Sequence, residues 1–212
     1  YFKQLFAQVT NPPIDALREE IVTSPVVYLG AEGNLLSPGP ESCRRIRLSH
    51  PVLSKAELAR LKAVQDGPFK SAVLPILFKA GGGGEALKAA LDALFASAEE
   101  AIHEGASILI LSDRGVDEEH AAIPALLAVS GLHHHLIRAG LRPKASIVLE
   151  SGEPREVHHF ACLIGYGAAA INPYVALDTV RNLAETGYIE GFTPDEAEKT
   201  YIKVAWKGVI KI

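Results

Sequence analysis

The stretch SILILSD, residues 107–113, is an apolar run of strand length that ends in polar residues. Three further apolar runs of strand length lie on either side of it, at Ala72–Phe78, Ser146–Leu149 and Ala168–Ile171. The segments between the runs have helical length, namely Glu85–His103, Ala121–Ala139 and Pro154–Tyr166. This alternation predicts parallel strands joined by crossover helices, and strands that are apolar throughout are typical of a sheet covered on both faces. The sequence therefore predicts an α/β layered domain with a mostly parallel sheet.

The residues before this alternation look irregular. Asn11-Pro12-Pro13 is typical of a turn. Two short helices, over Ile14–Val22 and Lys55–Val64, and an edge strand over Arg44–Leu48 are expected between the loops. We therefore divide the domain into an irregular N-terminal segment, residues 1–65, and an α/β body, residues 66–212.

Composition excludes several classes of protein. Of the 212 residues, 48% are hydrophobic and 22% are charged, which is ordinary for a globular domain and not for a disordered chain. The net charge of −4 gives no basic excess for nucleic acid, and no apolar run approaches the length of a membrane span. The two cysteines are too few for a disulfide framework or an all-cysteine iron–sulfur site, so we expect a reduced, cytoplasmic protein.

The chain begins at Tyr1 and contains no methionine. We therefore expect a piece of a longer polypeptide, whose function belongs to the whole. An irregular segment cut from its neighbours exposes apolar side chains that a monomer normally covers. We expect self-association or disorder over Tyr1–Leu36, where these side chains are Phe2, Leu5, Phe6, Leu35 and Leu36.

Polar residues follow the predicted strands, where ligands bind in open α/β sheets. They are Phe78-Lys79, Ser112-Asp113-Arg114, Glu150-Ser151-Gly152 and Asn172-Pro173-Tyr174. The alternative is that these side chains cap helices and pair with one another, which polar residues at strand ends commonly do. Within this set, Asp113 and Arg114 are expected to form an ion pair that holds the edge of the sheet.

The glycine run Gly81–Gly84, followed by Glu85 and Ala86, formally matches the dinucleotide fingerprint G-x-G-x-x-A. Asp113 would then hold the ribose. The match is poor, because two residues separate the first strand from the run and Asp113 lies further along than the fingerprint requires. A flexible loop is the competing interpretation of the four glycines.

Histidines and a cysteine raise two further possibilities. His133, His134 and His135 are consecutive on a helix, so they point about 100° apart and cannot share one metal. His158 and His159 precede Cys162 by one helical turn and could touch its sulfur. We expect helix-packing histidines and a buried, inert thiol, with no metal site.

The last helix has a clear start and a basic face. Thr193, Pro194 and Glu196 form a capping box with proline at the first helical position. The four lysines Lys199, Lys203, Lys207 and Lys211 recur every fourth residue and form one stripe. The stripe is either a solvated face or a contact with an acidic neighbouring domain.

Long motifs resemble the large chain of glutamate synthases, and the resemblance covers almost the whole sequence, from Phe2 to Ile212. They are QLFAQVTNPPID (residues 4–15), the stretch 121–140 ending in HHHLIRAG, ESGEPREVHHF (150–160) and GYGAAAINPY (165–174). All four belong to the family's central domain. That domain lies between the glutamine amidotransferase domain and the FMN-binding synthase domain.

The resemblance implies a Rossmann-like α/β fold and a function in L-glutamate biosynthesis. The family transfers the amide nitrogen of glutamine to 2-oxoglutarate, using electrons that pass through an iron–sulfur cluster and FMN. It implies that the amidotransferase and FMN-binding domains of the same polypeptide are the partners. No cofactor and no catalytic residue is expected in the present residues, because the chain opens with Tyr1 and not with the family's nucleophilic cysteine, and the cluster cysteines are missing.

The family's central domain is a scaffold and forms part of the wall of the channel that carries ammonia between active sites. Hydroxyl and amide side chains suit neutral ammonia, because they both donate and accept hydrogen bonds. The channel or interface candidates are Gln8, Thr10, Asn11, Ser112, Asp113, Arg114 and Asn172. The alternative function is a free-standing nucleotide-binding domain, which rests only on the glycine run and Asp113.

Overall fold

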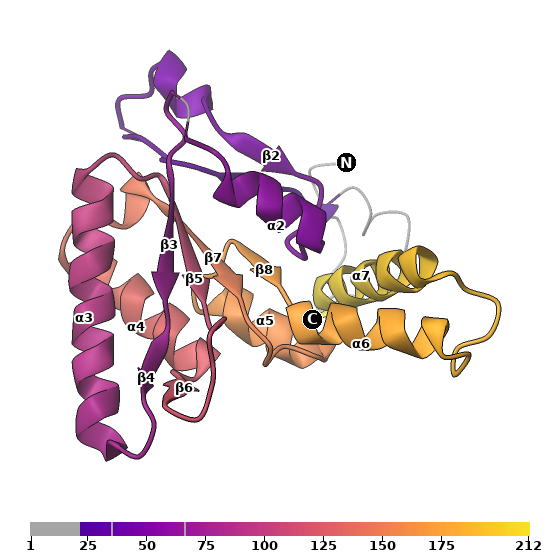
Figure 1. Cartoon of the computed structure of the whole chain (residues 1–212). Helices are drawn as coiled ribbons and strands as arrows, with labels where there is room; N and C mark the ends of the chain where they lie inside the picture. Colours follow the sequence, from indigo (N-terminus) through magenta and orange to yellow (C-terminus); the bar gives the residue numbers. More distant parts are fainter. Residues whose placement is uncertain (1–21, 35, 66) are drawn as a thin grey trace, which may run out of the picture.

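Four strands pair in parallel in the order β3-β5-β7-β8 in the computed structural model, which describes residues 22–34, 36–65 and 67–212 (Figure 1). Their bounds are Ser71–Pro75 for β3, Ile108–Ser112 for β5, Ser146–Glu150 for β7 and Ala170–Asn172 for β8. β5 and β7 are buried at every residue, so the sheet is covered on both faces. The predicted α/β fold with a mostly parallel sheet is confirmed.

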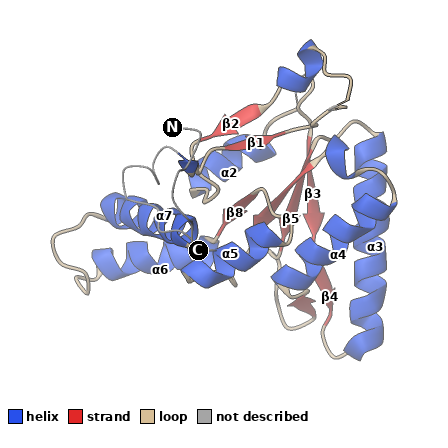
Figure 2. Cartoon of the chain, turned by 180° about the vertical axis from the view of Figure 1, so that it is seen from behind, coloured by secondary structure: helices blue, strands red, loops and turns tan. Residues whose placement is uncertain are grey.

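Three crossover helices cover one face of the sheet, as Figure 2 shows from behind. They are α3 (Gly83–His103), α4 (Ala125–Arg138) and α5 (Val157–Gly165). Leu109 and Leu111 of β5 point to this side and join the larger hydrophobic core. Alternate residues of a strand face opposite sides, so Ile108 and Ile110 belong to a second core on the other face.

The second face is covered by the residues that precede the sheet in the sequence. β1 (Val27–Leu29) pairs antiparallel with β2 (Ile46–Leu48), which confirms the predicted edge strand. The expected helix after it is α2 (Lys55–Lys62), whose Leu58 and Leu61 pack into the second core. A short 3-10 helix, η1 (Pro40–Cys43), lies between β1 and β2, and a second, η2 (Arg142–Lys144), precedes β7.

The chain protects the β8 edge of the sheet with its own backbone. Leu53 donates its amide to the Ile171 carbonyl at 2.8 Å, and Ile171 donates to Pro51 at 2.7 Å. Beyond this edge lie α6 (Tyr174–Glu185) and α7 (Pro194–Lys211), which pack against each other. The capping box at Thr193 is present as predicted, because Thr193 Oγ1 accepts from the Glu196 amide and the Glu196 carboxylate accepts from the Thr193 amide.

The predicted strand Ala72–Phe78 is wrong as a single strand. β3 ends at Pro75, and β4 (Leu77–Lys79) forms a separate two-stranded antiparallel sheet with β6 (His120–Ala122). The change of partner occurs at Ile76, whose amide donates to Ser112 of the main sheet while its carbonyl accepts from Ile123. Proline at the preceding position cannot donate to a ladder, so the main sheet ends there.

The predicted helix Ala121–Ala139 is wrong at its start. α4 begins at Ala125, and the predicted first residues, Ala121 and Ala122, belong to β6. Pro124 explains the difference, because a residue that precedes proline is disfavoured in the helical conformation. Sequence reasoning also missed α6, which follows β8 directly.

Several expectations fall on residues outside the described ranges. They are the turn at Asn11-Pro12-Pro13, all of the helix Ile14–Val22 except its last residue, and the apolar side chains Phe2, Leu5, Phe6 and Leu35. Leu36 is described, and its side chain is 96% exposed. The division at residues 65 and 66 stays a prediction.

Candidate functional site

Three buried polar residues end neighbouring strands and stand in one row at the carboxyl edge of the sheet. Ser112 of β5 is in register with Glu150 of β7, which in turn is in register with Asn172 of β8. Glu150 is 4% exposed and Asn172 only 1%. Parallel pairing brings strand ends to the same edge, so the predicted rim exists over these three strands. Lys79 does not belong to it, because β4 pairs in the separate sheet.

Glu150 is the centre of this row. Its carboxylate accepts from the hydroxyl of Ser112 at 2.5 Å and from the ammonium of Lys62 at 2.7 Å, and the Nε of Arg114 lies 3.3 Å away. Burial alone raises the pKa of Glu150, but the hydrogen bonds from Lys62 and Ser112 and the charge of Arg114 outweigh it and hold the pKa below its usual range. The carboxylate is therefore ionised at neutral pH.

The predicted ion pair between Asp113 and Arg114 is wrong. Arg114 pairs with Glu150, while Asp113 Oδ2 accepts from the hydroxyl of Ser151 at 2.7 Å and from the amide of Gly152 at 2.9 Å. Side chains of consecutive residues leave the chain in different directions, so adjacency in sequence does not make a pair. The alternative that these polar residues bond to one another is confirmed for this part of the rim.

Arg114 also lies over an aromatic ring. The centre of its guanidinium is 3.6 Å from the centroid of the Tyr174 ring, a close cation–π contact. Burial, and then the neighbouring carboxylate of Asp113, raise the pKa of Tyr174 to about 12. The phenol therefore keeps its proton at neutral pH and cannot act as a base.

Two buried acceptors in this rim receive no hydrogen bond from the described residues. They are Oδ1 of Asp113 and Oδ1 of Asn172. The Nδ2 of Asn172 donates to the carbonyl of Leu53 at 2.9 Å, which fixes the amide and directs its oxygen away from that bond. A buried acceptor without a donor costs free energy, on the order of 1–3 kcal/mol. These two atoms are the positions where the rim could receive a donor molecule.

The structure thus brings together four of the predicted candidates, Ser112, Asp113, Arg114 and Asn172. Gln8, Thr10 and Asn11 lie outside the described residues. Sequence reasoning placed Glu150 and Tyr174 at the strand ends but not among the channel or interface candidates, and it missed Lys62. The position of Glu150 at the end of an apolar strand was visible in the sequence, but no local pattern links it to Lys62.

The glycine run does not stand where a dinucleotide fingerprint must stand. It follows β4, in the small antiparallel sheet, and α3 begins at Gly83 within it. A fingerprint needs the glycines directly after a strand of the parallel sheet. Asp113, its expected ribose partner, already bonds to Ser151 and Gly152.

The histidines serve packing. His133 Nδ1 accepts from the Nε of Arg142 at 2.9 Å, and His135 lies within 2.5 Å of Glu99 and stacks on Phe95. Among residues 22–34, 36–65 and 67–212, no group of three or more His, Cys, Asp or Glu side chains is placed to hold a metal. None of the helices described there is long and apolar enough to cross a membrane.

The possible contact between a histidine and the sulfur of Cys162 is not the contact that His159 makes. His159 Nδ1 accepts from the amides of Arg155 and Glu156, at 3.2 and 3.4 Å, and so helps to start α5. Cys162 is half-buried and shares a cavity of about 210 Å³ with His159. Because Nδ1 of His159 accepts these backbone hydrogen bonds, His159 has a structural role at the start of α5.

Comparison with known proteins places these features in a family. The model of the glutamate synthase central domain matches residues 1–212. The chain is 52% identical, over its whole length, to the glutamate synthase [NADPH] large chain of Bacillus subtilis, and 46% identical to the chloroplastic ferredoxin-dependent glutamate synthase of Spinacia oleracea. It is 39% identical to the glutamate synthase [NADH] of Schizosaccharomyces pombe. The chain spans 14%, 14% and 10% of these relatives.

Proposed function

Since this chain belongs to the glutamate synthase central domain family, we propose that it is the non-catalytic connecting domain of a glutamate synthase large chain. In this role it holds the glutamine amidotransferase and FMN-binding domains of the same polypeptide in a fixed relation. The relatives, of which it spans only a small share, are named as whole glutamate synthases. The reaction of L-glutamate synthesis is therefore assigned to the parent polypeptide.

Hydrogen bonds between the rim and the residues that precede the sheet support the scaffolding part of the proposal. Lys62 reaches Glu150 from α2, and Leu53 anchors Asn172, so residues before the sheet are tied to its carboxyl edge. Buried charge-assisted hydrogen bonds of this kind fix orientation, because breaking them leaves a charge without a partner. A connecting domain needs parts that are held in a constant relative position if the domains on either side are to stay at a constant separation.

We further propose that the rim contributes to the wall of an ammonia channel. The observation that carries this is the buried acceptor Asn172 Oδ1, which has no donor among the described residues. Asp113 Oδ1 lies in the same rim, but Asp113 also interacts with the phenol of Tyr174. Neutral ammonia carries three N–H groups and would satisfy such an acceptor as it passes. Gln8, Thr10 and Asn11 are the remaining candidates for the wall, on side-chain chemistry alone.

FMN and the iron–sulfur cluster are assigned to other parts of the parent. An iron–sulfur cluster is usually held by four thiolates, and the whole chain contains only Cys43 and Cys162. The two are in different settings, Cys43 exposed and Cys162 half-buried on α5. These residues do not fit a cluster, so no electron-transfer step is assigned to this domain. The cytoplasmic location stays a prediction.

The channel role is tested in the parent enzyme by the ratio of glutamate formed to glutamine hydrolysed. Asn172→Leu, Thr10→Val and Asn11→Leu should lower this ratio while glutamine hydrolysis and flavin reduction continue, because ammonia escapes before it reaches the synthase site. Asn182→Leu, at an exposed position of α6, is the matched control. An unchanged ratio in all three variants would remove these residues from the channel wall.

A further inference from the structure

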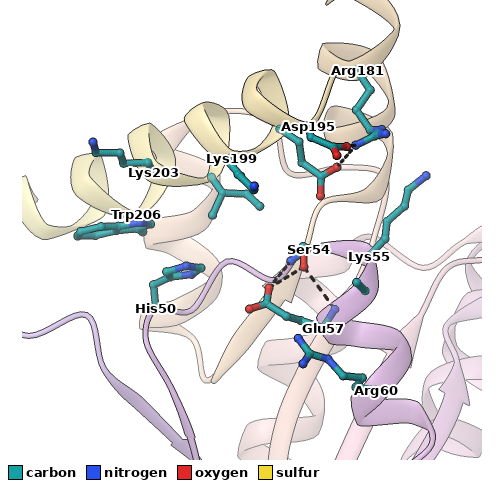
Figure 3. Close-up of a pocket in the computed structure, with 13 residues that line it drawn as sticks. His50, Ser54, Lys55, Glu57, Arg60, Arg181, Asp195, Lys199, Lys203 and Trp206 are labelled. Atoms are coloured by element: carbon teal, nitrogen blue, oxygen red, sulfur yellow. Dashed lines mark hydrogen bonds and ion pairs between the residues drawn. The ribbon is translucent and has the colours of Figure 1, made fainter. Parts of the chain in front are cut away.

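A groove with a volume of about 710 Å³ lies between α2 and α7, away from the rim (Figure 3). Residues 54–57 and 60 form one wall, and residues on one face of α7 form the other. His50 and Arg181 complete the lining.

The acidic side chains of the groove are already engaged. Asp195 and Glu198 both bind the guanidinium of Arg181, at 2.6 and 2.9 Å, as the dashed lines in Figure 3 show in part. Glu57 accepts from the backbone and hydroxyl of Ser54 in the capping box of α2. The carboxylates of the groove are therefore hydrogen-bonded to the protein's own donors, although a single guanidinium serves both Asp195 and Glu198.

Three cations of the groove have no such partner. Arg60 on α2 and Lys199 and Lys203 on α7 are exposed and form no hydrogen bond or ion pair with the described residues. Among the described residues, five cations and three carboxylates line the groove, so its net charge is positive, and the surplus lies on the α7 wall, where Lys199 and Lys203 stand. The lysine stripe of α7 contributes two of these three cations.

One end of the groove is apolar and aromatic. Trp206 stacks on His50, with ring centroids 6.0 Å apart and planes 5° from parallel. The Nδ1 of His50 is buried and has no partner among the described residues. Ile202, on α7 with Trp206, is buried and lines the same groove. Tryptophan and arginine are the residues that most often dominate binding at protein interfaces. The groove thus combines an aromatic side chain at one end with the lysines of α7 along its wall.

We propose that this groove docks an extended acidic segment of the same polypeptide, from outside residues 1–212, with an apolar side chain against Trp206. The proposal rests on the proposed function, since it requires a parent chain longer than this one. Lys199 and Lys203 are one helical turn apart, about 6 Å along the axis. Alternate residues of an extended chain point to the same side about 6.6 Å apart, so two carboxylates separated by one residue match the two lysines.

The test compares the lysines of the parent enzyme with those of the 212-residue chain alone. An activated acetate ester should modify Lys199 and Lys203 in the chain alone, and this modification should be lost in the parent. A zero-length carbodiimide should then join one of the two lysines to an Asp or Glu outside residues 1–212, which mass spectrometry identifies. Both results together support the proposal and name the segment.

Two variants of the parent enzyme test whether the lysines are protected by a segment held through charge attraction or by a surface that merely covers them. Arg60→Gln removes a cation from the opposite wall and should make Lys199 and Lys203 reactive again. Arg138→Gln makes the same change at an exposed position of α4 and should leave them protected.

Equal reactivity in parent and isolated chain overturns the proposal, as do cross-links confined to residues 1–212. Protection without a cross-link outside these residues also overturns it, because the occupant is then a small anion or a neutral surface. None of these outcomes bears on the ratio of glutamate to glutamine, so the proposed channel role is judged separately.

Discussion

Glu153 caps the start of α4 from a different part of the chain: both of its carboxylate oxygens accept from the amide of Ala125, each at 3.1 Å. Pro124 occupies the N-cap position and has no side chain that can do this. The first amides of a helix have no partner within the helix, and they lie at the positive end of its dipole. A carboxylate from the loop between β7 and α5 satisfies one of them and ties α4 to that loop.

Glu153→Ala should lower the free energy of unfolding by about 1–2 kcal/mol, the usual cost of a lost cap. Glu153→Gln should cost less, because its amide oxygen still accepts while the charge is gone. Urea denaturation followed by circular dichroism measures both. Glu185→Ala, at the exposed end of α6, is the control, and an equal loss in the control would show that the cap contributes nothing.

Glu150→Gln should destabilise the domain by about 3 kcal/mol, because Lys62 and Arg114 then lose the charge that they share. The folded pKa of Glu150 lies below its ordinary value of 4.5, so its contribution is present above that pH and is lost as the pH falls through the folded value. Urea unfolding at several pH values should therefore show a steeper acid loss in the wild type than in Glu150→Gln. If the free energy of unfolding falls equally with pH in both proteins, Glu150 is not the group that causes the acid loss.

Gly167→Ala should destabilise the fold, and the neighbouring Gly165→Ala should not. Gly167 has a φ of +115°, and a Cβ there would lie 2.3 Å from Nδ1 of His133. Overpacking of this kind costs about 1–3 kcal/mol, to which the strained backbone adds. Gly165 is helical with open space around it, so alanine should stabilise it by about 0.5–1 kcal/mol. Thermal unfolding of the two variants checks the opposite signs.

His133 should make the domain less stable in mild acid. Burial, and then the charge of Arg142, lower the pKa of His133 below its ordinary value of 6.5. The unfolded chain therefore binds the proton first, so stability is complete above about pH 6.5 and falls as the pH drops through the folded pKa. His133→Gln should flatten this part of the profile, whereas His103→Gln, exposed at the end of α3, should leave it unchanged. A profile that stays the same in His133→Gln would show that another group titrates.

The isolated chain should form no glutamate from glutamine and 2-oxoglutarate, and it should purify without colour. This follows from the proposed function, in which the nucleophile, the flavin and the cluster belong to the rest of the parent. Incubation with FMN followed by gel filtration is the measurement. A flavin absorbance that travels with the protein, or any glutamate formed, would contradict the proposal.

The sequence by itself determined the features that depend on neighbours along the chain. The alternation of apolar runs and helical segments predicts the parallel sheet, because burial on both faces requires strands that are apolar throughout. The start of α7 was predictable for a similar reason, since Thr193, Pro194 and Glu196 act on one another within a single turn.

Only the tertiary structure decided the partners within the rim. Lys62 and Glu150 are 88 residues apart in sequence, and Arg114, just past the end of β5, pairs with Glu150 of the adjacent strand β7 and not with its neighbour Asp113. The same holds for β4, which leaves the main sheet to pair with β6. Strand register and helix packing set which side chains meet, and both depend on the whole core. Local patterns thus predict which residues stand at the end of each strand, while the packed fold decides what each of them binds.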